Sequence, residues 1–241
     1  METTVQTSNQ NIEMLQKMVE AGVHIGHRKS KGHPKMKPFL LATRQNIQVI
    51  NVEKTLDELQ KAKEFIRDVV SRGGAVLFVA TKMPAKAIIK DIAVRVGMPY
   101  VTTRWLGGTL TNFDIISKRL GYFLKQEEDK NKGEWAKYTK KEQLLKEREL
   151  ADLEKKMGGL KILKKLPNAL VVVDIGEHDG MVREARHIGA PVVAITDTNT
   201  DPTLIDYPIP ANDRSLKSVK LLLDELAEAV QEGKNRITNN E

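Results

Sequence analysis

Residues 75–80 read AVLFVA, and residues 169–174 read ALVVVD. Each stretch is apolar on both of its faces, as strands are in a parallel sheet that helices cover on both sides. The first stretch follows an amphipathic helical pattern over residues 53–71 and precedes a predicted helix over residues 84–96, which Pro84 can open. This alternation predicts an α/β fold with a doubly wound, mostly parallel, Rossmann-like sheet.

Segments on either side continue the alternation. Strands are predicted at residues 46–51, 99–103, 191–197 and 207–209, and helices at residues 12–21, 180–188 and 215–232. The sheet domain is therefore predicted over residues 12–112 and 167–232. Residues 1–11 and 233–241 are predicted to be flexible tails.

Residues 113–166 interrupt this alternation. Apolar residues recur there at spacings of three and four, first at Phe113, Ile116, Leu120 and Phe123, and later at Leu150, Leu153, Met157 and Leu160. Thr139 followed by Glu142 matches a capping box for the second helix. The pattern predicts an antiparallel coiled-coil helical hairpin inserted into the sheet domain. An independent helical domain is the alternative.

Charge is distributed unevenly along a chain whose formal net charge is +7. Residues 1–169 hold 32 basic and 19 acidic residues, whereas residues 170–232 hold 5 basic and 12 acidic ones. Residues 21–52 contain no acidic residue, and Pro34 and Pro38 oppose a regular helix there. We expect a flexible, extended basic arm that follows a phosphate backbone, while the acidic half faces solvent or a basic protein partner.

The candidate RNA contacts are basic residues of this arm, with Lys and Arg supplying mainly sequence-independent affinity. They are Arg28, Lys29, Lys31, Lys35, Lys37 and Arg44. Replacing Lys35 and Lys37 by Ala is expected to weaken RNA association and to flatten its salt dependence. Arg104, Trp105 and Asn112 are second-rank candidates, because they can instead fix the base of the hairpin.

Other chemistries find little support in the sequence. No cysteine is present, the apolar runs are too short to span a bilayer, and neither a Gly-rich phosphate loop nor a GxSxG elbow occurs. His24-Ile25-Gly26-His27 matches the HIGH tetrapeptide of class I aminoacyl-tRNA synthetases, but it comes before every predicted strand, whereas in those enzymes the motif follows the first strand of the nucleotide fold. Asp197 and Asp201 follow a strand and offer a weak Mg²⁺ site, although helix capping and turn formation explain them more simply. We therefore expect no cofactor, no catalytic site and no small-molecule substrate.

Several ordered motifs resemble one known family. They are EAGVHIGH at residues 20–27, PKMKPF at 34–39, GMPYV at 97–101, RWLGGTLTNF at 104–113, LPNALVVVD at 166–174 and DTNTDP at 197–202. Together they resemble bacterial-type small-subunit ribosomal protein two over roughly residues 12–232. The resemblance implies a Rossmann-like sheet with a protruding coiled-coil hairpin, and a structural role in translation.

The same resemblance implies partners and a location. The family contacts small-subunit rRNA between the head and the body, touches other small-subunit proteins, and helps dock bacterial ribosomal protein one near the mRNA exit region. The expected location is the cytoplasm, on the ribosome, or an organelle ribosome of bacterial type, with no membrane partner. Two alternatives stay open: a small α/β enzyme that uses a nucleotide or sugar phosphate, and a protein–protein scaffold whose docking arm is the hairpin.

Overall fold

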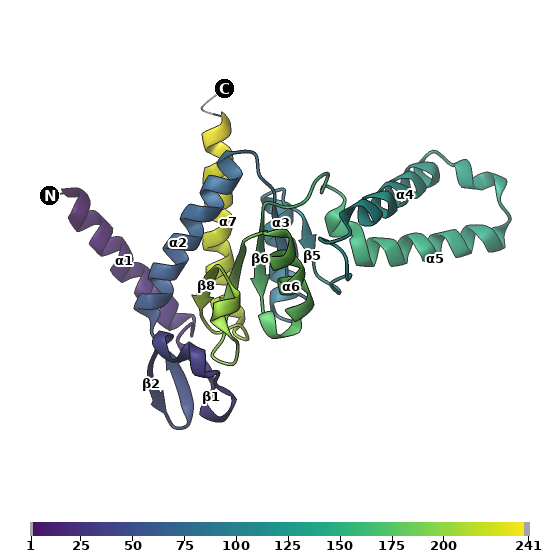
Figure 1. Ribbon diagram of the computed structural model, residues 1–241. Coiled ribbons are helices and arrows are strands. Elements are labelled where there is room, and N and C mark those ends of the chain that lie inside the picture. The colour runs from purple at the N-terminus through teal and green to yellow at the C-terminus, as the bar shows by residue number, and fades with distance from the viewer. Residues whose placement is uncertain (1, 239–241) are drawn as a thin grey trace.

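Parallel strands form the centre of the computed structural model, which describes residues 2–238 (Figure 1). The strands are β4 (Val76–Val79), β5 (Tyr100–Val101), β6 (Ala169–Val173), β7 (Val192–Thr196) and β8 (Tyr207–Pro210). Their order across the sheet is β5-β4-β6-β7-β8, and every neighbouring pair is parallel. The predicted doubly wound parallel sheet is confirmed, and its order reverses between β4 and β6, as in flavodoxin-like folds.

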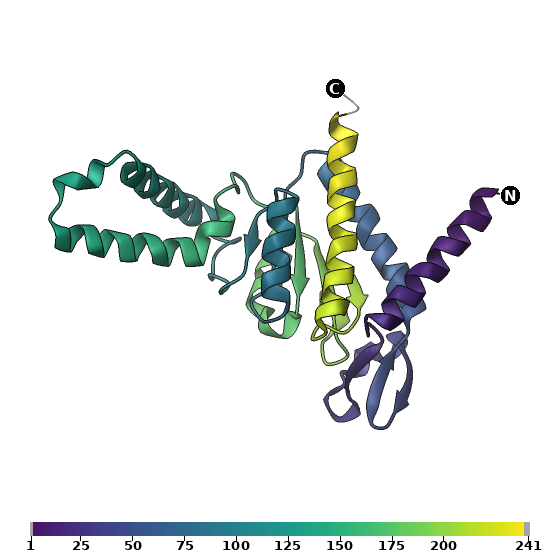
Figure 2. The same ribbon diagram turned by 180° about the vertical axis from the view of Figure 1, so that it is seen from behind.

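Helices cover both faces of this sheet (Figures 1 and 2). One face carries α2 (Val52–Ser71), α3 (Ala85–Arg95) and α7 (Leu216–Thr238), with α1 (Glu2–Glu20) packed on α2, and the other carries α6 (Asp179–Ile188). Val76 and Phe78 belong to the first core, while Leu77 and Val79 of the same strand belong to the second. Successive residues of a strand point to opposite faces, so a continuous apolar run supplies both cores.

Two antiparallel helices pack at their base on the second face and project beyond the β5 edge of the sheet (Figures 1 and 2). They are α4 (Phe113–Asn131) and α5 (Lys140–Met157), and the turn between them contains the 3-10 helix η3 (Glu134–Lys137). The predicted capping box at Thr139 and Glu142 is present. Phe123 of α4 and Leu153 of α5 share the buried cluster with sheet residues, so the base of the hairpin continues the core of the sheet domain.

A second, smaller sheet replaces the extended arm that the sequence predicted. Its strands are β1 (Ile25–Arg28), β2 (Leu40–Arg44) and β3 (Ile47–Ile50), in the antiparallel order β1-β3-β2, with the 3-10 helices η1 (Lys29–Lys31) and η2 (Pro34–Phe39) between β1 and β2. The prediction of a flexible arm was wrong, because an acid-free composition reports charge and not disorder. The strand predicted at residues 46–51 exists as β3, but it lies outside the parallel sheet.

The two ends of the chain also differ from prediction. Residues 2–11, predicted as part of a loose tail, form the first half of α1, and α7 extends beyond residue 232 to Thr238. Residues 2–11 contain neither Gly nor Pro, so nothing in their sequence breaks a helix. Residues 1 and 239–241 of the predicted tails lie outside the described residues.

Short 3-10 helices complete the remaining connections. They are η4 (Gly158–Leu160), η5 (Ile175–Glu177) and η6 (Pro202–Leu204). Among residues 2–238, no helix is long and apolar enough to cross a membrane.

Candidate nucleic-acid interface

The small sheet is fixed to the loop that follows β7. The backbone amide of His27 donates to Thr198 Oγ1 at 2.9 Å, and the amide of His33 donates to the Thr198 carbonyl at 2.7 Å. Gly26 lies so close to this loop that an added Cβ would stand 2.5 Å from Thr198 Cγ2 and 2.9 Å from the Gln48 carbonyl. The sequence places Gly at the point where two backbones meet, and this contact anchors the basic segment to the parallel sheet.

A tight turn brings two arginines to one face of the small sheet. Gln45 and Asn46 both adopt positive φ, at 46° and 64°, as a two-residue hairpin turn between β2 and β3 requires. Arg28 of β1 and Arg44 of β2 are each in register with Ile47 of the central strand. Residues in register on neighbouring strands share a face. The two guanidinium groups therefore flank Ile47, with their backbones roughly 10 Å apart.

Every predicted basic residue of the segment is exposed. Within residues 2–238, no acidic side chain pairs with the following five, which we call the arm surface: Arg28, Lys29, Lys31, Lys37 and Arg44. These cations lie on the small sheet and on its 3-10 helices η1 and η2. Because they are exposed and unpaired, phosphate groups can reach them without first breaking an internal ion pair.

Lys35 differs from the other five. Its Nζ lies 2.7 Å from Asp201 Oδ2 and donates to Thr203 Oγ1 at 2.9 Å. The hydrogen bond from Lys35, helped by two donors from Thr203, lowers the pKa of Asp201 to about 2. Lys35 thus ties the 3-10 helix η2 to the loop after β7, and half of its side chain, 53%, remains exposed.

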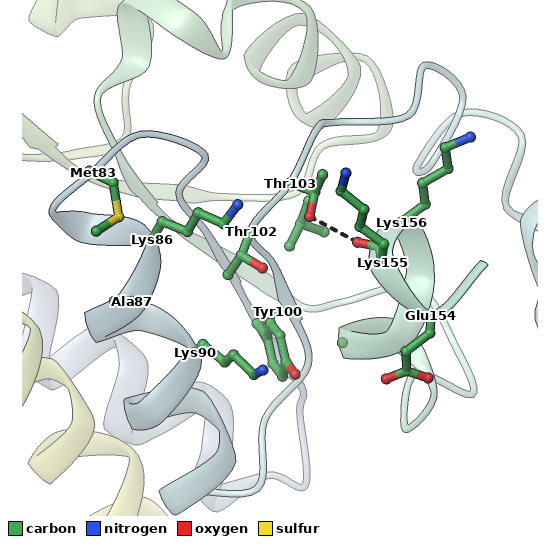
Figure 3. A pocket seen from close by; sticks show the side chains of 12 residues that line it. Met83, Lys86, Ala87, Lys90, Tyr100, Thr102, Thr103, Glu154, Lys155 and Lys156 are labelled. Carbon is green, nitrogen blue, oxygen red and sulfur yellow. Dashed lines mark hydrogen bonds between the residues drawn. The ribbon is translucent and has the colours of Figure 1, made fainter. Parts of the chain in front are cut away.

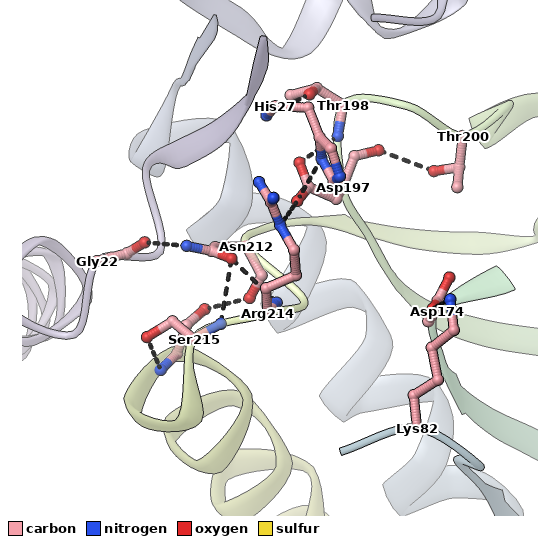
Figure 4. A network of polar contacts seen from close by, with 11 residues as sticks. Gly22, His27, Lys82, Asp174, Asp197, Thr198, Thr200, Asn212, Arg214 and Ser215 are labelled. Atoms are coloured by element: carbon pink, nitrogen blue, oxygen red, sulfur yellow. Dashed lines mark hydrogen bonds and ion pairs between the residues drawn. The ribbon is translucent and has the colours of Figure 1, made fainter. Parts of the chain in front are cut away.

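Carboxylates and cations alternate at the carboxyl edge of the parallel sheet (Figure 4). His27 Nδ1 lies 2.8 Å from the fully buried carboxylate of Asp197, and Arg214 Nε lies 3.8 Å from the same oxygen. Burial raises the pKa of Asp213 to about 7, and the charges of Asp197 and Asp174 act in the same direction. The interactions of Asp197 link the small sheet, the parallel sheet and the start of α7.

The carboxylates expected to form a weak Mg²⁺ site, Asp197 and Asp201, instead face basic side chains. Asp197 faces His27 and Arg214, and Asp201 faces Lys35, so each carboxylate already has a cationic neighbour. Over the described part of the chain, no group of three or more His, Asp or Glu side chains is arranged to hold a metal ion.

The second-rank candidates lie at the base of the hairpin. Trp105 is half-buried and donates from Nε1 to Glu184 Oε1 at 3.0 Å, whereas Arg104 and Asn112 are exposed. Trp105 therefore supports the loop, and the structure does not bring these three residues together with the arm surface (Figure 1). Asn112 precedes α4 and makes no side-chain cap.

Glu184 of α6 organises this loop, and sequence reasoning missed it. Besides Trp105, its carboxylate accepts from the amides of Gly108, Leu110 and Thr111 at 2.9, 3.0 and 3.3 Å. Burial by itself raises the pKa of Glu184, but these donors outweigh it and leave the pKa below its usual value. No sequence pattern links Glu184 to a loop more than 70 residues earlier.

A small crevice of 300 Å³ lies where doubly wound folds usually bind ligands, beyond β4 and β6. Its two principal cations already face carboxylates, since Lys82 Nζ lies 3.0 Å from Asp174 Oδ2 and Arg214 lies beside Asp197. Asp213 also lines this crevice. A phosphate there would compete with these acids, which disfavours the nucleotide-using enzyme.

Comparisons with known proteins agree with one another. A family model described as ribosomal protein S2 matches residues 18–233. The chain is 43% identical over 227 residues to small ribosomal subunit protein uS2 of Roseiflexus castenholzii, covering 94% of this chain and 86% of the relative. It is 47% identical over 217 residues to the protein of the same name from Bifidobacterium longum subsp. infantis, covering 90% and 77%. The corresponding Leifsonia xyli protein is 44% identical over 219 residues, covering 91% and 74%.

Proposed function

Because the chain belongs to the ribosomal protein S2 family, we propose that it is a structural, non-catalytic component of the small ribosomal subunit. In this proposal it binds small-subunit rRNA through the arm surface and acts on the ribosome during translation. The arm surface is the main support for RNA binding, because its five exposed cations have no acidic partner among residues 2–238. An ordered, acid-free surface of this kind suits the phosphate backbone of a folded RNA.

The salt dependence of binding tests this proposal. Lys29 and Lys31 are better targets than the pair Lys35 and Lys37, since replacing Lys35 also breaks its ion pair with Asp201. We expect Lys29→Ala/Lys31→Ala to weaken binding to small-subunit rRNA and to make the slope of log K against log salt less steep by about 1 to 2.

A control variant removes two positive charges from α7 instead of from the arm surface. Lys217 and Lys220 are exposed lysines of α7, and no acid among the described residues pairs with them. Lys217→Ala/Lys220→Ala should leave the slope close to that of the unaltered protein. Equal slopes for the arm variant and for the unaltered protein would remove the arm surface as the RNA contact.

The second part of the proposal concerns a protein partner. We propose that the acidic half, residues 170–232, faces a basic surface of a neighbouring small-subunit protein, and that the chain helps dock bacterial ribosomal protein one where that protein exists. The excess of 12 acidic over 5 basic residues supports an electrostatic contact. Glu228 is exposed on α7, and its carboxylate lies 3.0 Å from Lys63 Nζ. Glu228→Lys also breaks this ion pair, so its urea midpoint is measured beside binding. The variant should slow association with such a partner at low salt and leave rRNA binding unchanged.

A further inference from the structure

The base of the hairpin lies away from the small sheet (Figure 1), and several lysines gather there. A cleft of 340 Å³ opens there between α3, the edge strand β5 and the end of α5 (Figure 3). Lys86 and Lys90 approach it from α3, and Lys155 and Lys156 approach it from α5. Four lysines from two elements distant in sequence therefore line one cleft.

Most of this positive charge is uncompensated. Glu154 is the acid that lines the cleft, and its carboxylate lies 2.6 Å from Lys161 Nζ. Lys156 is paired with Asp152 at 2.6 Å. Three lysines, namely Lys86, Lys90 and Lys155, have no acidic partner among residues 2–238. The ammonium groups on the facing walls repel one another. An anion bound between them would reduce this electrostatic repulsion.

The walls of the cleft are held in position. Thr103 Oγ1 donates to the carbonyl of Lys155 at 2.8 Å, which joins the strand-end loop to α5 (Figure 3). Gly159 lies against Tyr100 so closely that an added Cβ would stand 2.6 Å from its ring carbon Cδ2. The spacing of the lysine backbones is thus set before any ligand arrives, which lowers the entropy cost of binding.

A hydroxyl group and an aromatic ring also line the cleft, and together they favour a nucleic acid as the ligand. Thr102 lines the cleft with a hydroxyl group that can donate to a phosphate oxygen, and Tyr100 adds an aromatic ring. Lysine and threonine are common contacts to nucleic-acid phosphates, and a ring beside them can stack on an unpaired base. A phosphodiester strand uses both features together, because its phosphates can face the lysines while an unpaired base stacks on the ring.

We propose that this cleft binds a phosphodiester segment of RNA, as a contact separate from the arm surface. The proposal rests on the proposed function, because the RNA in question is small-subunit rRNA. Lys86, Lys90 and Lys155 neutralise neighbouring phosphates, and the rigid walls fix the path of the strand.

A tethered cleavage probe locates RNA near the cleft. The chain has no cysteine, so Ala87→Cys at the exposed edge of the cleft and Ser30→Cys in the small sheet each create a unique thiol. An iron–EDTA group attached to each thiol cuts RNA nearby when the protein is bound. We expect position 87 to cut small-subunit rRNA at nucleotides different from those cut from position 30.

Salt titration of Lys86→Ala/Lys90→Ala gives the second readout, with Lys217→Ala/Lys220→Ala as the charge-matched control. The cleft variant should make the salt slope less steep by about 1 to 2 while its urea midpoint stays unchanged. Cuts from position 30 alone, with a cleft variant that behaves like the control, would overturn the cleft proposal and leave the proposed function standing. Cuts from neither position would overturn both.

One further outcome identifies a different partner. The cleft variant can be added to small subunits lacking this protein, and the composition of the particle can then be measured. Unchanged rRNA binding together with loss of a neighbouring acidic protein would mean that the cleft is a protein site, which overturns the RNA proposal.

Discussion

Glu184 illustrates how one half-buried carboxylate determines the conformation of a loop. It accepts one hydrogen bond from the indole of Trp105 and three from backbone amides between Gly108 and Thr111. An ionised carboxylate can serve these donors with both oxygens, and each such charge-assisted bond is stronger than a neutral one. The loop that connects the sheet to the hairpin is therefore held by a residue of α6.

Replacement of this carboxylate by an amide tests that role. Glu184→Gln leaves one acceptor oxygen and turns an NH₂ group toward the loop donors, so we expect a loss of about 1–3 kcal/mol in the free energy of unfolding. Urea denaturation followed by Trp fluorescence measures it. The exposed control Glu64→Gln should change stability by no more than about 0.5 kcal/mol. Equal midpoints for the two variants would show that the loop does not depend on Glu184.

Asp213 makes the free energy of unfolding fall as the pH rises, whereas most carboxylates make it rise. Its pKa is raised to about 7 in the folded chain, whereas its ordinary value is 3.8. Between these two values the folded state binds more protons than the unfolded state, so stability falls as the pH rises from about 4 to about 7. We expect Asp213→Asn to reduce this decline, as measured by urea midpoints across that range. A decline of unchanged steepness in the variant would assign it to other groups.

At the scale of elements, two glycines have opposite structural roles. Gly26 faces a backbone carbonyl and Thr198 with no room for a Cβ, whereas Gly121 lies inside α4 with no atom within 4 Å of the Cβ that Ala would add. The first glycine fixes the small sheet to the parallel sheet. The second lies where a methyl group would meet no other atom.

The two alanine substitutions should therefore change stability in opposite directions. Gly26→Ala forces the small sheet away from the β7 loop, and we expect a loss of about 1–3 kcal/mol together with faster amide exchange in β1 and β3. Gly121→Ala should stabilise the chain by up to about 1 kcal/mol, because Ala is the better helix former. A Gly26→Ala protein with the parent's stability and exchange rates would mean that the small sheet is not anchored there.

The elements differ in how far the sequence predicts them. The parallel strands and the capping box at Thr139 are predictable because continuous apolar runs and local spacing specify them. The small sheet is predictable only in part: the sequence indicates β3, but β1 and β2 carry no continuous buried run, and the turn at Gln45 and Asn46 lacks glycine. Exposure of the arm cations follows from their chemistry, whereas the bond from Lys35 to Asp201 spans 166 positions and leaves no local signal.

In the whole molecule, the excess of basic and the excess of acidic residues lie in different parts of the chain and in different parts of the fold. The basic small sheet and the basic cleft belong to the first 169 residues, and the acidic segment supplies β6 to β8, α6 and most of α7. The chain thus presents basic residues at two separate places, on the small sheet with its 3-10 helices and at the base of the hairpin. This division suits a protein that lies between RNA and neighbouring proteins.

Co-sedimentation with small ribosomal subunits stripped of loosely held proteins tests whether the protein binds one specific site on the particle. The purified protein is added in increasing amounts at low and at high salt, and the copies bound per particle are counted. We expect saturation at one copy, with affinity that falls as salt rises. Absence from the particle, or binding that never saturates, would contradict it and would leave the arm surface as a general binder of polyanions.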